Sequence, residues 1–235
     1  MHEVGAFPPL LEEVKVVAIR QAYSAISEDT DALHRLAYYY DPRGNYSGTS
    51  FLDAAPNPPS DIVAADLYAV TRLSMTIRND QSRLILSEGP ERDTAISLLR
   101  AIPDNASILE LSPSLLQSMW DFYDHFRCLL ATGVKDSNHW VFAAKLCARK
   151  RPKLFPVRDG KVCQYLSGDT RPKSKANRIG QFGNDIQVFK YLMGDESFVA
   201  IMSRLQRICG ERRIAVDQSQ LRFLDVLLWT KAMQY

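Results

Sequence analysis

Several features that define common classes of protein are missing from this sequence of 235 residues. No apolar run approaches the roughly 20 residues that a membrane-spanning helix needs. The first residues show no basic region followed by an apolar one, so we expect no signal peptide. The four cysteines are widely spaced and form no CxxC pair, whereas structural zinc and iron–sulfur sites need clustered ligands. We therefore expect a cytoplasmic protein with reduced thiols and with no metal or other cofactor.

The sequence also lacks the short motifs of several large enzyme classes. It contains no GxxxxGK[ST] phosphate-binding loop, no GxGxxG motif after a strand and no GxSxG nucleophile motif. Its four histidines form no HExxH motif and no close pair. These absences argue against a nucleoside triphosphatase of the P-loop type, a dinucleotide-dependent enzyme, a serine hydrolase of the Ser-His-Asp type and a metallohydrolase.

Positive charge is concentrated in one segment. The chain has a formal net charge of only +2, yet residues 145–178 contain eleven basic and two acidic residues, so this segment carries +9 and the remainder −7. Such a segment in a nearly neutral protein is typical of a surface for a polyanion, most often a nucleic acid. The alternative is a solvated helix face with an adjoining loop.

The pattern of apolar residues predicts helices along most of the chain. We find no convincing alternating strand and no internal repeat, so we expect one all-α domain over 1–235, with room for two lobes at 1–111 and 112–235. The expected helices are 10–27, 32–39, 62–77, 80–87, 91–101, 113–131, 137–149, 160–166, 184–193, 195–209 and 217–233.

One long segment is predicted to be irregular. Residues 40–60 contain four prolines and two glycines, which favours a loop without helix. Loops of this length inside a domain are usually functional or mobile.

The most informative pattern lies in residues 129–162. It predicts a helix, a turn at Gly133, a second helix, a basic elbow over 149–153 and an aspartate, Asp159, that opens another helix. A helix N-terminus and a glycine turn can offer backbone N–H groups to a phosphate. A carboxylate beside a phosphate-binding surface opposes binding, so Asp159 is more easily explained if it performs chemistry. The alternative is that Asp159 only caps the helix that starts at Gly160, as aspartates routinely do.

This segment resembles the helix-hairpin-helix DNA glycosylase superfamily over roughly residues 112–166. Residues 130–134 (Leu-Ala-Thr-Gly-Val) are similar to its hairpin, and residues 155–159 (Phe-Pro-Val-Arg-Asp) are similar to the element that carries its catalytic aspartate. Lys135 replaces the second hairpin glycine. The resemblance implies a helix-hairpin-helix glycosylase-like fold, with Asp159 as the catalytic residue. Trp140 occupies the position of the nucleophilic lysine of bifunctional relatives, so the resemblance implies a monofunctional enzyme that uses water.

The implied reaction is hydrolysis of an N-glycosidic bond in double-stranded DNA, which leaves an abasic site. A carboxylate can stabilise the oxocarbenium-like transition state and orient water, and the base must leave the stack and enter an aromatic or apolar pocket. The candidates for this pocket are Trp140, Trp120, Tyr165, Tyr39 and Tyr46. The candidates for DNA contacts are Gly133, Lys135, Lys145, Arg149, Lys150, Arg151, Lys153, Arg158 and Lys161.

The identity of the base stays open at this stage. Relatives repair damaged bases, but the long 40–60 loop favours a roomy pocket and hence bulky modified cytosines of phage DNA, in antiviral defence. Two other functions remain as alternatives. One is a non-catalytic nucleic-acid-binding module, and the other is an interaction protein that docks an acidic partner through 145–178.

Overall fold

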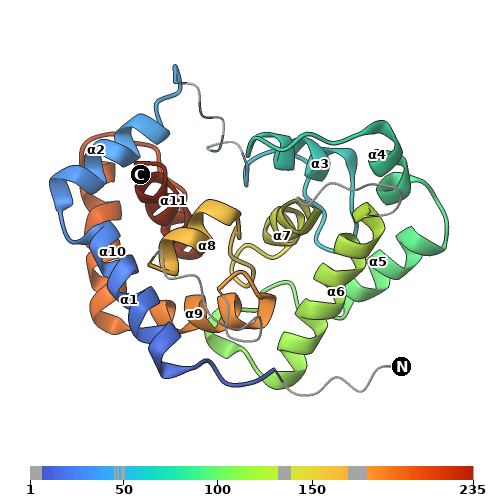
Figure 1. The fold of residues 1–235 in the computed structure, drawn as a ribbon. Coiled ribbons are helices and arrows are strands. Elements are labelled where there is room, and N and C mark those ends of the chain that lie inside the picture. Colours follow the sequence, from blue (N-terminus) through green and yellow to red (C-terminus); the bar gives the residue numbers. More distant parts are fainter. Residues whose placement is uncertain are drawn as a thin grey trace.

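The apolar periodicity of the chain produces an all-helical protein in the computed structural model (Figure 1). The structure describes residues 7–44, 46, 48, 51–131, 139–168 and 179–234. Over these residues it contains eleven α-helices, one short 3₁₀ helix and no strand, which confirms the all-α prediction.

The helices form two groups that pack side by side (Figure 1). The first group comprises α1 (Glu12–Ile26), α2 (Asp29–Tyr39), α8 (Gly160–Leu166), α9 (Phe182–Gly194), α10 (Glu196–Glu211) and α11 (Gln220–Ala232). The second comprises α3 (Ala64–Thr71), α4 (Asn79–Leu86), α5 (Pro90–Arg100), α6 (Pro113–Ala131) and α7 (His139–Lys150). The 3₁₀ helix η2 (Ile108–Glu110) contacts α9 and so links the groups.

This grouping does not follow the lobes predicted at 1–111 and 112–235. Helices α1 and α2 pack against α8, α10 and α11 from the other end of the chain, while α3 and α5 pack against α7 and α6. Buried apolar residues from both groups belong to one contiguous core. The first group therefore forms only when the two ends of the chain come together.

Most predicted helices lie where the sequence placed them, with ends displaced by a few residues. Helix α8 spans the predicted range, and the Asp159 side chain caps it by accepting hydrogen bonds from two backbone N–H groups. The exception is the helix expected over 62–77, which ends at Thr71. Its chain turns away because Ser74 adopts a positive φ of 59° and the Leu73 carbonyl accepts a 2.8 Å hydrogen bond from Lys145 Nζ.

Helices α7 and α11 are almost fully buried, and both carry charged residues into the interior. Lys145 is on α7, and Arg222 and Asp225 are on α11. Because an unpaired buried charge is costly, these side chains need partners, and they meet at a pocket between the two groups of helices.

Candidate active site

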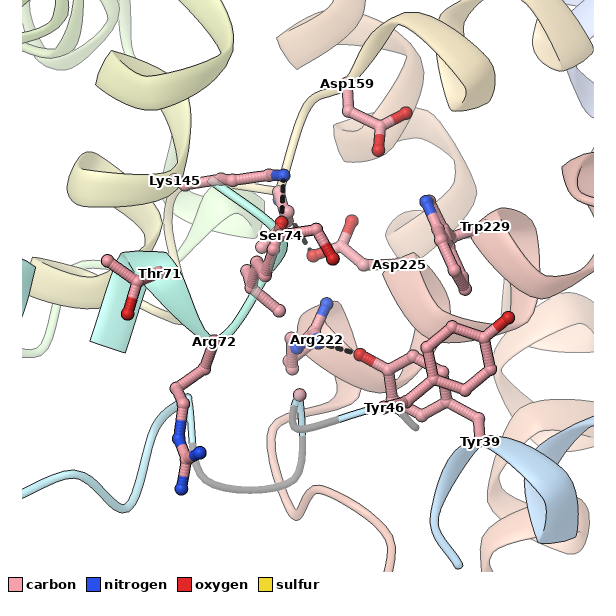
Figure 2. A pocket seen from close by; sticks show the side chains of 13 residues that line it. Tyr39, Tyr46, Thr71, Arg72, Ser74, Lys145, Asp159, Arg222, Asp225 and Trp229 are labelled. Carbon is pink, nitrogen blue, oxygen red and sulfur yellow. Dashed lines mark hydrogen bonds between the residues drawn. The ribbon is translucent and has the colours of Figure 1, made fainter. Parts of the chain in front are cut away.

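A pocket of about 280 Å³ lies where α2, α3, α7, α8 and α11 converge (Figure 2). Its volume is close to the lower end for small-molecule sites, about 300 Å³. It is lined by Tyr39, Tyr46, Gly48, Thr71, Arg72, Leu73, Ser74, Lys145, Val157, Asp159, Arg222, Asp225 and Trp229. Both groups of helices and the 40–60 loop therefore contribute to one site.

One wall of the pocket is aromatic. The rings of Tyr39 and Tyr46 stack with centroids 5.4 Å apart, and Trp229 meets Tyr46 edge to face at 5.3 Å. The three side chains lie together on one side in Figure 2. Such a wall offers ring faces and edges to a planar ligand. The structure thus places Tyr39 and Tyr46, two of the five predicted pocket residues, in the lining of the same pocket as Asp159.

Asp159 lies at the opposite end of the pocket, at the N-terminus of α8 (Figure 2). Its Oδ1 accepts hydrogen bonds from the backbone N–H groups of Lys161 at 2.9 Å and Val162 at 3.0 Å. These bonds fix the carboxylate and use a single oxygen, so the capping role and a role toward a ligand are compatible. Asp159 is half-buried, within reach of the pocket.

A second carboxyl group lines the same pocket. Asp225 is 2% exposed, and its Oδ2 accepts a 2.8 Å hydrogen bond from the Val157 N–H. Its Oδ1 is buried and has no hydrogen-bond partner among the described residues. Burial raises the pKa of Asp225 to about 8, and the nearby charges of Asp159 and Asp217 add to this effect. Burial therefore favours the neutral form of the Asp225 carboxyl group.

Lys145 is a buried cation of the site. Its Nζ donates a 2.8 Å hydrogen bond to the Leu73 carbonyl. Burial lowers the pKa of Lys145 to about 8, although the charge of Asp159 opposes this shift. The ammonium group is thus held inside the pocket near Asp159, and the prediction that Lys145 contacts DNA phosphates is wrong for this buried position.

Arg222 links α11 to the aromatic wall. Its Nη2 donates a 2.7 Å hydrogen bond to the Tyr39 hydroxyl (Figure 2), and its Nε lies 3.7 Å from Asp217 Oδ2. The 40–60 loop comes so close to the Tyr39 side chain that position 48 requires a glycine. A Cβ at Gly48 would lie 1.8 Å from the Tyr39 hydroxyl. The loop therefore packs its backbone directly onto the Tyr39 side chain.

The basic elbow is not a surface for phosphates, and this corrects the prediction for three of its residues. Arg149, Lys150 and Arg151 are at most 4% exposed. They hold the 51–59 part of the long loop: Arg149 donates to the carbonyls of Phe51, Leu52 and Ala54, Lys150 to that of Pro58, and Arg151 to that of Pro59. The Asp66 carboxylate forms ion pairs with Arg149 at 3.2 Å and with Lys150 at 2.9 Å. A proline-rich loop has few helical or sheet partners for its carbonyls, so side-chain donors satisfy them.

Arg158 also lies in the interior, which corrects its predicted role in DNA contacts. It pairs with Asp185 at 2.6 Å, and both side chains are 2% exposed. Its guanidinium lies 5.3 Å from the ring centre of Trp140. Trp140 therefore packs against an internal ion pair and is not part of the pocket lining.

Two further predicted pocket residues lie elsewhere. Trp120 packs edge to face on Phe182, with ring centres 5.5 Å apart. Tyr165 donates a 2.7 Å hydrogen bond from its hydroxyl to the Gln21 carbonyl. Both assignments are wrong, because each ring is committed to packing between helices of the fold and neither belongs to the lining of this pocket.

The remaining predicted DNA contacts fall into two sets. Lys153 and Lys161 are exposed, on either side of Asp159 along the chain. Gly133 and Lys135 lie outside the described residues, as does the turn predicted there. The described part of the +9 segment thus has its positive charge mostly inside the protein.

The sequence interpretation missed the contribution of α11. Arg222 and Asp225 stand one helical turn apart in the otherwise apolar stretch LRFLDVLLW. Two charged residues on one face of an apolar helix are a signal for a buried polar site, since each needs a partner. Arg72 was also missed. It lines the pocket, and its Nε is buried with no hydrogen-bond partner among the described residues.

Two general findings concern the described part of the chain as a whole. None of its helices has the length and apolar character needed to cross a membrane. No group of three or more His, Cys, Asp or Glu side chains in these residues is arranged to hold a metal ion.

Comparison with known proteins assigns the chain to a family. Residues 32–232 match the model of DUF6308, described as a family of unknown function, and the chain belongs to that family. No curated protein matches the chain. No solved structure matches it either. The matched residues include every residue of the pocket lining.

Proposed function

We propose that this protein is a monofunctional DNA glycosylase, which hydrolyses the N-glycosidic bond of a damaged or modified base and leaves an abasic site. One observation carries the proposal. The Asp159 carboxylate, fixed by two backbone hydrogen bonds, shares a pocket of about 280 Å³ with the aromatic wall of Tyr39, Tyr46 and Trp229.

The geometry suits an extruded base and its sugar. A flipped base is held by stacking on aromatic side chains, and these line one side of the pocket. The anomeric carbon then lies toward Asp159, whose negative charge stabilises the positive charge that develops on the sugar. The same carboxylate accepts a proton from the attacking water. That water rather than a lysine attacks the sugar is what the sequence resemblance implies, because Trp140 occupies the position of the nucleophilic lysine of bifunctional relatives.

DNA as the substrate is supported by the sequence resemblance and by a few cationic groups near the pocket. Arg72 lines the pocket with an unpartnered Nε, and Lys153 and Lys161 are exposed near Asp159 in the chain. Helices α6 and α7 pack against each other, and the chain runs from α7 through Asp159 into α8. This order of elements matches the glycosylase pattern described for residues 112–166.

The proposal is tested by incubating the protein with a panel of DNAs. The panel contains unmodified duplex, duplexes with uracil or 7-methylguanine, and phage DNA with modified cytosines, and alkali converts abasic sites to strand breaks. Asp159→Asn keeps an oxygen for the helix cap but removes the charge. Asp195→Asn is the matched control, because Asp195 caps α10 in the same way through the Phe198 N–H.

Breaks made by the natural protein and by Asp195→Asn, but not by Asp159→Asn, support the proposal. Salt-dependent DNA binding without breaks on any DNA favours the non-catalytic binding module instead. Absence of both binding and breaks favours the interaction protein. Activity on phage DNA in preference to the other substrates supports the defence role over repair.

A further inference from the structure

We propose that Asp225 is a second catalytic carboxyl group, a general acid that protonates the leaving base through its unpartnered Oδ1. This inference rests on the proposed glycosylase function and adds a residue and a substrate preference to it. It assigns chemistry to a buried carboxyl that the single-aspartate reaction does not use.

The position of Asp225 is fixed at one oxygen and open at the other. The Val157 N–H holds Oδ2 at 2.8 Å, whereas Oδ1 is buried without a partner among the described residues. Unsatisfied buried oxygens are rare in folded proteins and call for an explanation. Asp225 lines the pocket together with Asp159 and Trp229, and Figure 2 shows it between Lys145 and the aromatic wall. Oδ1 itself is closed to solvent, so a ligand in the pocket becomes its partner only where neighbouring side chains move aside to let the ligand reach it.

The charged groups around Asp225 set its protonation state. Arg222 on the same helix favours the carboxylate, while Asp159 from the start of α8 and Asp217 from the segment before α11 favour the neutral acid. Lys145 from α7 also lines the pocket, and the Tyr39 hydroxyl accepts a hydrogen bond from Arg222. Burial outweighs the attraction of Arg222 and raises the pKa of Asp225 to about 8. A neutral carboxyl and an ionised one in one site match the two roles of acid and base in glycoside hydrolysis.

The reaction balances with these two groups and one water. The bond between the anomeric carbon and the base nitrogen breaks, and its electron pair stays on the base. The base takes a proton from Asp225 Oδ1. Water oxygen bonds to the anomeric carbon and loses a proton to Asp159, and exchange with solvent returns that proton to Asp225. The products are a hydroxyl at the sugar and the free neutral base.

This arrangement predicts a class of substrate. Neutral bases leave poorly as anions and gain from protonation at a ring nitrogen or carbonyl oxygen. Cationic alkylated bases such as 7-methylguanine already carry a positive charge and leave as neutral molecules. General acid catalysis is worth about 10²- to 10⁴-fold in rate. The natural substrate is therefore a neutral base with an acceptor atom that reaches Asp225.

The test compares the natural protein with Asp225→Asn on duplexes that carry uracil, 5-hydroxymethylcytosine or 7-methylguanine. The asparagine keeps an oxygen for the Val157 N–H and is nearly the same size. Single-turnover excision is measured from pH 6 to 9. We expect Asp225→Asn to slow excision of a neutral base about 100-fold at pH 6.5, and to slow excision of 7-methylguanine far less.

The pH dependence separates an acid from a structural residue. Asp225 loses its proton above pH 8, so the excision rate of the natural protein divided by that of Asp225→Asn should fall there for a neutral base. Effects of Lys145 are common to both proteins and cancel in this ratio. A ratio that stays constant with pH, an equal loss on neutral and cationic bases, or excision of 7-methylguanine alone by the natural protein overturns the inference. None of these outcomes removes the glycosylase proposal, which fails only if no DNA yields abasic sites that require Asp159.

Discussion

The backbone N–H of Val157 donates a 2.8 Å hydrogen bond to Oδ2 of Asp225, and this bond joins the segment that carries Asp159 to α11. Asp225→Ala should therefore lower the free energy of unfolding by about 1–3 kcal/mol, because it leaves a buried N–H unsatisfied. Asp225→Asn retains an acceptor and should cost much less. Urea unfolding of both variants measures the difference. Equal losses in the two variants would show that this hydrogen bond does not fix the segment.

Stability should depend on pH through Asp225. Its pKa is about 8 in the folded protein and near 3.9 in an unfolded chain, so between these values the folded state binds more protons. The stability contributed by this group is fully present below about pH 4 and is lost as the pH rises from there to about 8, by up to about 1.4 kcal/mol per pH unit.

Urea unfolding at pH 5, 6.5 and 8 should show this loss in the natural protein relative to Asp225→Asn. Lys145, whose pKa is lowered to about 8, changes the free energy of unfolding in the opposite direction. Above pH 8 this lysine binds more protons in the unfolded chain than in the folded one, so its contribution to stability rises with pH only there. A difference between the two proteins that does not change from pH 5 to 8 would contradict the assignment of Asp225 as a neutral acid.

The buried basic elbow should behave as a structural element. Arg149→Met removes donors from four loop carbonyls and from Asp66, so we expect a loss of about 3–5 kcal/mol in the free energy of unfolding. Lys153→Met, at an exposed neighbouring position, should change it by no more than about 0.5 kcal/mol. If Arg149→Met instead weakened DNA binding while leaving stability intact, Arg149 would be a phosphate contact after all.

Gly48 should be required for the aromatic wall. In Gly48→Ala the new Cβ would meet the Tyr39 hydroxyl at 1.8 Å, so the ring must move and its hydrogen bond to Arg222 is lost. We expect DNA cleavage after alkali to fall at least about tenfold, since a displacement of about 1 Å can cost more. Gly210→Ala is the control, because nothing lies within 4 Å of its added Cβ. Equal activity of both variants would show that the reaction does not depend on the position of Tyr39.

The sequence predicted the helices well because amphipathic periodicity and capping are local properties. Helix α8 and its cap at Asp159 followed from a few adjacent residues. Tyr39 and Tyr46, named as pocket candidates from the sequence, line the same pocket as Asp159. The error in the helix expected to continue to 77 has a non-local cause, the hydrogen bond between Lys145 on α7 and the Leu73 carbonyl.

The charges of the elbow were harder to interpret. A run of basic residues looks exposed in the sequence when its partners are distant in the chain. Here the partners are Asp66 and the carbonyls of the proline-rich loop about 90 residues earlier. The role of α11 was missed for the same reason. Arg222 and Asp225 gain meaning only when α11 packs beside α2 and α8.

The measurement that tests the proposed function most directly is the release of free base from DNA, followed by mass spectrometry on the panel described above. Hydrolysis of an N-glycosidic bond yields one free base for each abasic site. We expect the natural protein and Asp195→Asn to release base from at least one modified DNA in this ratio, and Asp159→Asn to release none. Binding without base release from any DNA, or equal release by Asp159→Asn, would contradict the proposal.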